Sequence, residues 1–124
     1  MKKILLYGVD QENLMKIVPV LQDSGARVHL LKNEELHQEL LEVLDSDECF
    51  EYEEPHYDMS LCLFGGYTKD EIYDVIGQLS GLGVKKPVFA TVTQKNIHWK
   101  IGRLLVDVNQ EHAEMQKLAR EKKL

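Results

Sequence analysis

Blocks of apolar and polar residues follow one another along the 124-residue chain and predict strands and helices in turn. Two continuous apolar runs, residues 4–7 and 61–64, each end at a glycine, as expected of strands that are covered on both faces. Residues 27–31 and 88–92 contain β-branched and alternating apolar positions, which favour strands with one less buried face. Stripes of apolar residues at helical spacing follow each of these strands.

Four amphipathic helices are predicted in the segments after the strands. Asp10 can cap the first, and Asn33 opens the second with acidic residues at its positive end. Thr68 begins a capping box for the third helix. Thr93 is placed to cap the fourth, which should begin immediately after it.

The order of these elements predicts an α/β fold with a four-stranded parallel sheet in the order 2-1-3-4 and helices on both faces. Two βαβα repeats are expected, because the second half matches the first element by element, and the apolar positions of its first helix fall 58 residues after those of the first half, as Ile72 and Leu79 follow Leu14 and Leu21. A chance resemblance between two βαβ units is the alternative. The predicted organisation is a single domain, 1–124, with halves 1–44 and 59–109, an acidic linker 45–58 and a helical tail 110–124.

Charge is distributed unevenly along the chain, whose formal net charge is −6. Residues 1–58 hold 5 Lys/Arg against 14 Asp/Glu, a net charge of −9, and residues 59–124 hold 10 against 7, a net charge of +3. The acidic balance argues against nucleic acid as a partner, because binding to phosphates depends on Lys and Arg. The asymmetry favours a second copy of the chain or another protein as the partner.

Composition also bears on the compartment. No apolar run approaches the length of a membrane span, and the first apolar run is too short for a signal peptide, so a cytoplasmic protein without membrane contact is expected. Cys62 lies in an apolar strand and is interpreted as a structural thiol. Cys49 lies in the acidic linker without a visible activating base.

The first candidate site depends on the parallel sheet, because ligands bind such sheets beyond the carboxyl ends of the strands. A crevice is expected there between Gly8 and Asp10 on one side and Gly65, Gly66 and Thr68 on the other. The N-termini of two helices would favour a small anionic metabolite or a nucleotide. The alternative is that these glycines only satisfy the backbone of tight turns.

The second candidate site is formed by Thr93, Asn96 and Trp99. These residues can form a surface that contacts a partner or a ligand. The alternative is that Thr93 and Asn96 complete a helix cap while Trp99 closes the edge of the sheet.

A set of residues in the second half also carries a family resemblance: Pro87, Ala90, Thr93, Asn96 and Trp99, followed by Glu111 and His112. They fit a proline, then Ala-x-x-Thr-x-x-Asn-x-x-Trp, then a helix that ends near Glu-His. On this pattern the run from 61 to 118 resembles the uncharacterised bacterial family called domain of unknown function 3783. Where that family usually has a basic residue before the alanine, this chain has Phe89. The resemblance implies a bacterial cytoplasmic domain and brings no activity with it.

Patterns typical of catalysis are missing from the sequence. The third strand ends in Phe64 and two glycines, without the aspartate of a phosphoacceptor domain, and there is no GxSxG motif. No metal, cofactor or catalytic residue is predicted, and an enzyme would require the acidic linker to lend a carboxylate. The sequence therefore predicts a non-catalytic protein-interaction module, with a small anionic metabolite or nucleotide binder as the alternative.

Overall fold

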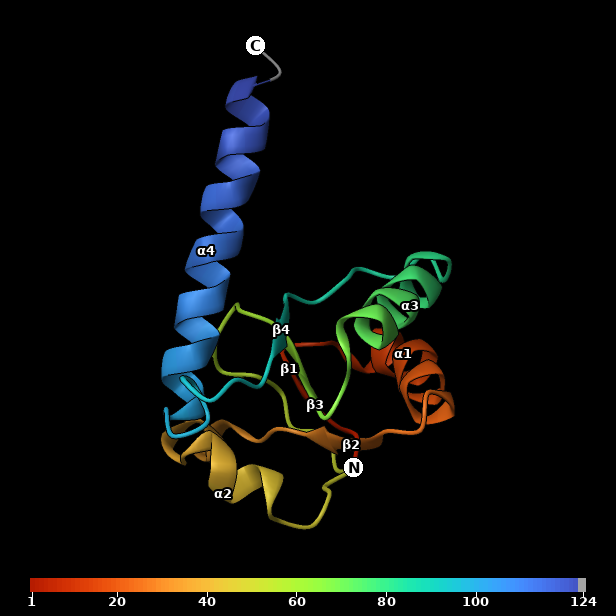
Figure 1. The fold of residues 1–124 in the computed structure, drawn as a ribbon, viewed down its shortest axis with the longest axis vertical. Coiled ribbons are helices and arrows are strands. Elements are labelled where there is room, and N and C mark those ends of the chain that lie inside the picture. The colour runs from red at the N-terminus through yellow and green to blue at the C-terminus, as the bar shows by residue number, and fades with distance from the viewer. Residues whose placement is uncertain (123–124) are drawn as a thin grey trace.

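A computed structural model describes residues 1–122 of the chain (Figure 1). The four strands form one sheet in the order β2-β1-β3-β4, as predicted. Helices α1 and α3 cover one face, and η1, α2 and the first half of α4 cover the other. In chain order the elements are β1 (Lys3–Tyr7), α1 (Gln11–Asp23), β2 (Arg27–Leu30), the 3-10 helix η1 (Asn33–His37), α2 (Leu40–Leu44), β3 (Leu61–Gly65), α3 (Lys69–Ser80), β4 (Phe89–Thr91) and α4 (Ile101–Lys122).

The prediction of an entirely parallel sheet is wrong. β1 is parallel to β2 and β3 is parallel to β4, but the central strands β1 and β3 are antiparallel. The acidic linker explains this direction. It passes along the outer edge of β2, where the N–H of Leu30 donates to the carbonyl of Cys49 at 2.7 Å. The linker thus carries the chain to the far end of β1, where Leu61 pairs with Tyr7.

Asn33 fixes the linker at that far end of β1. Its Oδ1 accepts from the Tyr7 hydroxyl at 2.6 Å and from the His56 N–H at 2.8 Å. Its Nδ2 donates to Oε1 of Glu53 at 3.0 Å and to the carbonyl of Glu54 at 2.9 Å. Because this buried amide uses both its oxygen and its nitrogen, the linker is an ordered strap with a defined path.

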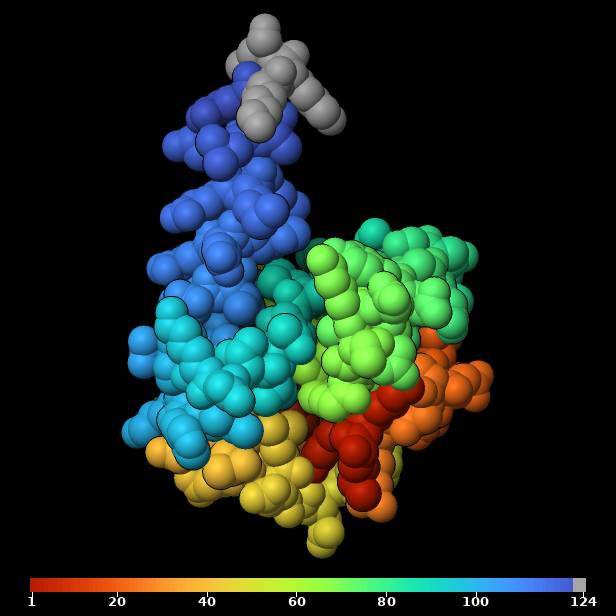
Figure 2. Space-filling model, in the orientation of Figure 1, coloured from red at the N-terminus to blue at the C-terminus, as the bar shows by residue number. Residues whose placement is uncertain are grey.

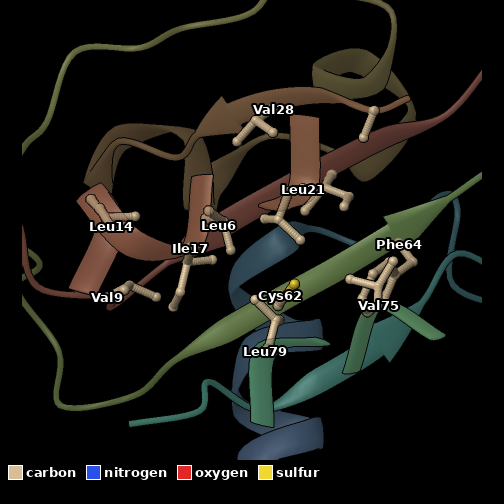
Figure 3. Close-up of a cluster of buried hydrophobic side chains, with 12 residues drawn as sticks. Leu6, Val9, Leu14, Ile17, Leu21, Val28, Cys62, Phe64, Val75 and Leu79 are labelled. Atoms are coloured by element: carbon tan, nitrogen blue, oxygen red, sulfur yellow. The ribbon is translucent and has the colours of Figure 1, made fainter. Parts of the chain in front are cut away.

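Two clusters of buried side chains lie on the two faces of the sheet. Figure 3 shows the first, in which side chains of α1 and α3 point toward β1 and β3. Cys62 belongs to this cluster, and burial raises the pKa of its thiol, as expected of a structural cysteine. The second cluster joins the sheet to η1, α2 and α4.

The second and fourth helices begin differently from the prediction. The second is divided into η1 and α2, and the fourth begins at Ile101 after a series of turns. An antiparallel bridge between Glu39 and Lys100 causes both breaks. Next to the bridge, the N–H of Leu40 donates to the carbonyl of Trp99 at 2.9 Å, which requires extended backbone where a continuous helix was expected.

The strand pairings relate the two halves of the sheet to each other. At the centre of the sheet Leu5 pairs with Leu63. On the side of β1 that faces away from β3, Leu5 pairs with His29 of β2. On the side of β3 that faces away from β1, Leu63 pairs with Ala90 of β4. Each position of one half of the sheet therefore has a counterpart in the other, and His29 and Ala90 are such a pair of counterparts.

Lys3 joins β1 to the end of α2. Its Nζ donates to the carbonyls of Val43 and Leu44, each at 3.0 Å, and of Ser46 at 2.7 Å. Burial lowers the pKa of this amine. The carbonyl of Val43 also accepts from the N–H and the hydroxyl of Ser46, at 3.1 and 2.7 Å. For the carbonyls of Leu44, at the end of α2, and of Ser46 beyond it, the ammonium is the donor.

We expect Lys3→Met to reduce the free energy of unfolding by about 1–3 kcal/mol, because it keeps the buried stem but leaves the carbonyls of Leu44 and Ser46 without their donor. Urea titration followed by circular dichroism measures the loss. Lys16→Met is the matched control, since Lys16 is an exposed residue of α1, and it should cause a much smaller loss. Equal losses for the two variants would contradict the role given to Lys3.

Candidate functional site

The antiparallel pairing places the residues of the first candidate site at opposite ends of the sheet. Gly8 follows the carboxyl end of β1, and Gly65 is the last residue of β3. In the register of these strands Gly65 pairs with Lys3, at the start of β1, whereas Tyr7 pairs with Leu61. Gly8 and Asp10 thus lie at one end, and Gly65, Gly66 and Thr68 at the other, so they do not line one crevice.

Close approach of the backbone explains two of these glycines. Gly8 has φ +74° and Gly66 has φ +80°, in the left-handed region that favours glycine. A Cβ at Gly8 would collide with the carbonyl of Met59, and a Cβ at Gly66 would collide with that of Met1. Both glycines allow the chain to turn against its antiparallel neighbour.

Asp10 and Thr68 are helix caps, as predicted. The N–H of Asn13 donates to Oδ1 of Asp10 at 2.8 Å. Thr68 and Glu71 form the predicted capping box, in which the N–H of Thr68 donates to Oε1 of Glu71 at 2.9 Å. Glu71 also contacts the ammonium of Lys2, and this hydrogen bond, helped by those from Thr68, lowers the pKa of Glu71 to about 2.

Thr93 and Asn96 hold the turn that follows β4. The N–H of Thr93 donates to Oδ1 of Asn96 at 2.8 Å, and the N–H of Asn96 donates to Oγ1 of Thr93 at 3.1 Å. Nδ2 of Asn96 donates to the carbonyl of Thr91 at 3.0 Å. Trp99 lies beyond this turn, half-buried, with the guanidinium of Arg103 at 3.9 Å from its ring centroid. The structure therefore brings the second candidate group together around a capped turn.

A groove of about 610 Å³ lies between β4 and α4, and we call it the β4–α4 groove. Thr93, Asn96 and Trp99 line it near the end of β4, while His112 and Met115 line it on α4. Six of the seven residues that carry the family resemblance line this groove, and they are Ala90, Thr93, Asn96, Trp99, Glu111 and His112.

The outer edge of β4 borders this groove and was not among the sites predicted from the sequence. β4 uses the carbonyl of Val88, the backbone of Ala90 and the N–H of Val92 to pair with β3. Phe89 and Thr91 therefore direct their backbone groups outward. Within residues 1–122 the N–H and carbonyl of Phe89 and the N–H of Thr91 have no hydrogen-bond partner, whereas the carbonyl of Thr91 accepts from Asn96. The signal in the sequence was Pro87, since proline is confined to strand starts and sheet edges.

A second groove, of about 910 Å³, contains Gly8 and Asp10. The linker contributes Glu54 and Asp58 to its wall, and the loop before β4 contributes Lys85 and Lys86. Charges of both signs therefore surround this groove.

Two other kinds of feature are missing from the described part of the chain. Between residues 1 and 122 there is no group of three or more His, Cys, Asp or Glu side chains placed to hold a metal ion. None of the helices in this range combines the length and the apolar character that a membrane span requires.

The capping box at Thr68 predicts a dependence of stability on pH. Because the folded pKa of Glu71, about 2, lies below its ordinary value of 4.5, the ionised carboxylate stabilises the fold above pH 4.5 and loses this effect as the pH falls through 2. Urea midpoints measured from pH 7 to pH 2 should fall less steeply for Glu71→Gln than for the wild type. Asp74→Asn, an exposed position of the same helix, should follow the wild-type curve. Parallel curves for the wild type and Glu71→Gln would contradict this assignment.

Comparison with known proteins gives one family match. Residues 60–115 match the family described as "Domain of unknown function (DUF3783)". Neither the curated proteins nor the solved structures gave a match. The segment from the start of β3 to the exposed half of α4, which includes the β4–α4 groove, is therefore similar to this family.

Proposed function

We propose that this chain is a cytoplasmic, non-catalytic protein-interaction module that binds a segment of its partner along the outer edge of β4, beside the β4–α4 groove. The observation that carries the proposal is the open edge itself. Phe89 and Thr91 offer three outward backbone groups without partners in the described residues. Such an edge can accept an added strand, with main-chain hydrogen bonds for affinity and side-chain pockets for specificity.

The exposed half of α4 supports the same surface. All residues from 110 to 121 are exposed, and Figure 2 shows this part of the helix rising clear of the body. Met115 and Leu118 are 67% and 56% exposed. Both residues follow Val108 at helical spacing and so extend one apolar stripe along α4. Their exposure shows that no other part of the described chain covers this end of the stripe. Because Met115 lines the groove, a partner at β4 can also contact α4.

The positions of two groups with reactive chemistry, His29 and Cys62, also support a non-catalytic role. His29 is buried, with Nε2 at 2.9 Å from Oε2 of Glu35, and its Nδ1 accepts from the N–H of Cys49 at 3.2 Å. Cys62 is buried in the core. These side chains are engaged in holding the fold together.

We also infer that the two halves form an internal repeat of two βαβα units. The central pair of Leu5 and Leu63 supports it, and so do the turns after the outer strands. After β2 the N–H of Lys32 donates to Oε1 of Glu35 at 2.8 Å. At the equivalent place after β4 the N–H of Thr93 donates to Oδ1 of Asn96, also at 2.8 Å. The same local hydrogen bond thus follows both outer strands.

The proposal predicts that peptides selected for binding to the chain depend on the N–H of Thr91. We expect display of a random peptide library on the wild-type protein to enrich binders. Thr91→Pro removes this donor and no backbone hydrogen bond to β3, so the enriched peptides should lose binding to it. Isothermal titration measures the loss.

The matched control is Thr91→Val, which keeps the N–H and removes only the hydroxyl that donates to the carbonyl of Phe64 at 3.2 Å. It should bind the peptides as the wild type does. Failure to enrich any peptide, or equal binding by wild type and Thr91→Pro, would exclude the β4 edge as the interaction surface.

A further inference from the structure

The other outer strand shows what covers an edge of this sheet. On β2 the N–H of Leu30 points outward and donates to the carbonyl of Cys49 at 2.7 Å. The N–H of Cys49 in turn donates to Nδ1 of His29 at 3.2 Å. The acidic linker of the chain itself therefore covers the edge of β2 with an extended segment.

Ion pairs flank this covered edge at both ends of β2. Nε of Arg27 lies 3.2 Å from Oε1 of Glu48, and Nζ of Lys32 lies 3.3 Å from Oε2 of Glu51. Residues 48, 49 and 51 contact residues 27, 30 and 32 in the same order, so the covering segment runs parallel to β2. Its attachment combines a backbone hydrogen bond with acidic side chains on flanking cations.

Thr91 on β4 is the counterpart of Leu30. The next residue in each half makes the equivalent bond to the central strands: the N–H of Leu31 donates to the carbonyl of Leu6 at 2.8 Å, and the N–H of Val92 donates to that of Phe64 at 2.9 Å. The N–H of Thr91 therefore points outward as that of Leu30 does. No segment of residues 1–122 covers it.

A difference in one side chain explains why a groove lies beside the edge of β4. His29 pairs with Leu5, Ala90 pairs with Leu63, and Leu5 and Leu63 pair with each other at the centre of the sheet. Ala90 therefore occupies the position on β4 that His29 occupies on β2. On β2 the imidazole accepts from the N–H of Cys49 in the covering segment and contacts Glu35 of η1 through Nε2, whereas on β4 the methyl group of Ala90 is much smaller and makes no such bond. The β4–α4 groove includes Ala90 in its lining, so a side chain of an added segment can enter there.

The charge around β4 complements an acidic segment. Residues 75–106 contain no Asp or Glu, and their five Lys/Arg are Lys85, Lys86, Lys95, Lys100 and Arg103. On β2 the cations are Arg27, its first residue, and Lys32, which follows the strand. Lys86, whose Nζ donates to Oγ of Ser80 at 3.0 Å, precedes β4, and Lys95 follows it. The linker that covers β2, residues 45–58, contains seven acids and no Lys or Arg. The covered edge thus pairs a cation-flanked strand with an acidic segment, and the open edge supplies the cation-flanked strand alone.

We propose that the open edge of β4 binds an extended acidic segment of a partner protein, parallel to β4, with the N–H of Thr91 donating to a backbone carbonyl and acidic side chains beside Lys86 and Lys95. This inference rests on the protein-interaction role proposed above and adds the chemistry of the partner. Asp107 and Glu111 line the α4 wall of the groove. Residues of the segment that face this wall are therefore neutral, and the acids alternate with them on the other side of the strand.

The test uses a synthetic peptide of residues 46–53 of this chain, with serine at the position of Cys49, as an acidic probe. Titration into the ¹⁵N-labelled full chain should shift the amide of Thr91 and leave that of Leu30, which the linker already covers, unchanged. A peptide with Asn and Gln in place of its acids should bind roughly tenfold more weakly at low salt, since it loses two charge pairs. Lys86→Glu combined with Lys95→Glu should weaken the acidic peptide by a similar factor, and raising the salt concentration should reduce both differences.

The remaining outcomes separate this inference from the function on which it rests. Equal binding of the acidic and the neutral peptide at Thr91 would overturn the acidic preference and leave the β4 interaction surface in place. Shifts of Thr91 that depend on protein concentration without peptide would identify a second copy as the occupant and overturn the acidic segment. If neither peptide shifts Thr91 and peptide display enriches no Thr91-dependent binder, both proposals fail.

Discussion

The antiparallel pairing of β1 with β3 is the constraint on which the rest of the structure depends. Leu5 and Leu63 meet at its centre, and both are fully buried. Each central strand carries its own parallel neighbour, so β2 and β4 become the two outer edges and run in opposite directions. The same pairing brings the chain into close contact with Gly8 and Gly66, where a larger residue would collide with backbone.

Local signals predicted much of this fold because the interactions behind them span only a few residues. Asp10 and Thr68 bond to groups three residues away, and their helices begin where the sequence indicated. The strand order was also predictable, since fully apolar strands belong in the centre. The direction of β3 was not, because it is set by contacts such as that between Asn33 and Glu54, which are 21 residues apart and belong to no repeating pattern.

The candidate site was predictable in part for a similar reason. Thr93, Asn96 and Trp99 were identified from one short stretch, and one turn does bring them together. Gly8 and Gly65 were joined only through an assumed strand direction, and they separated when that direction reversed. The open edge required a comparison of the two halves in space. The small side chain of Ala90 becomes informative only when the imidazole of His29 is seen at the equivalent place.

The edge of β4 has features that restrict which segments could pair with it. Unprotected edges tend to pair with other chains, and proteins restrict them with short strands and proline. β4 has three residues and follows Pro87, so it offers only three outward backbone bonds. At about 1 kcal/mol each, these bonds fall short of the roughly 4–15 kcal/mol that association costs in lost freedom. Binding at this edge must therefore draw most of its free energy from the groove, the exposed stripe of α4 and the flanking lysines, and these side chains would select the partner.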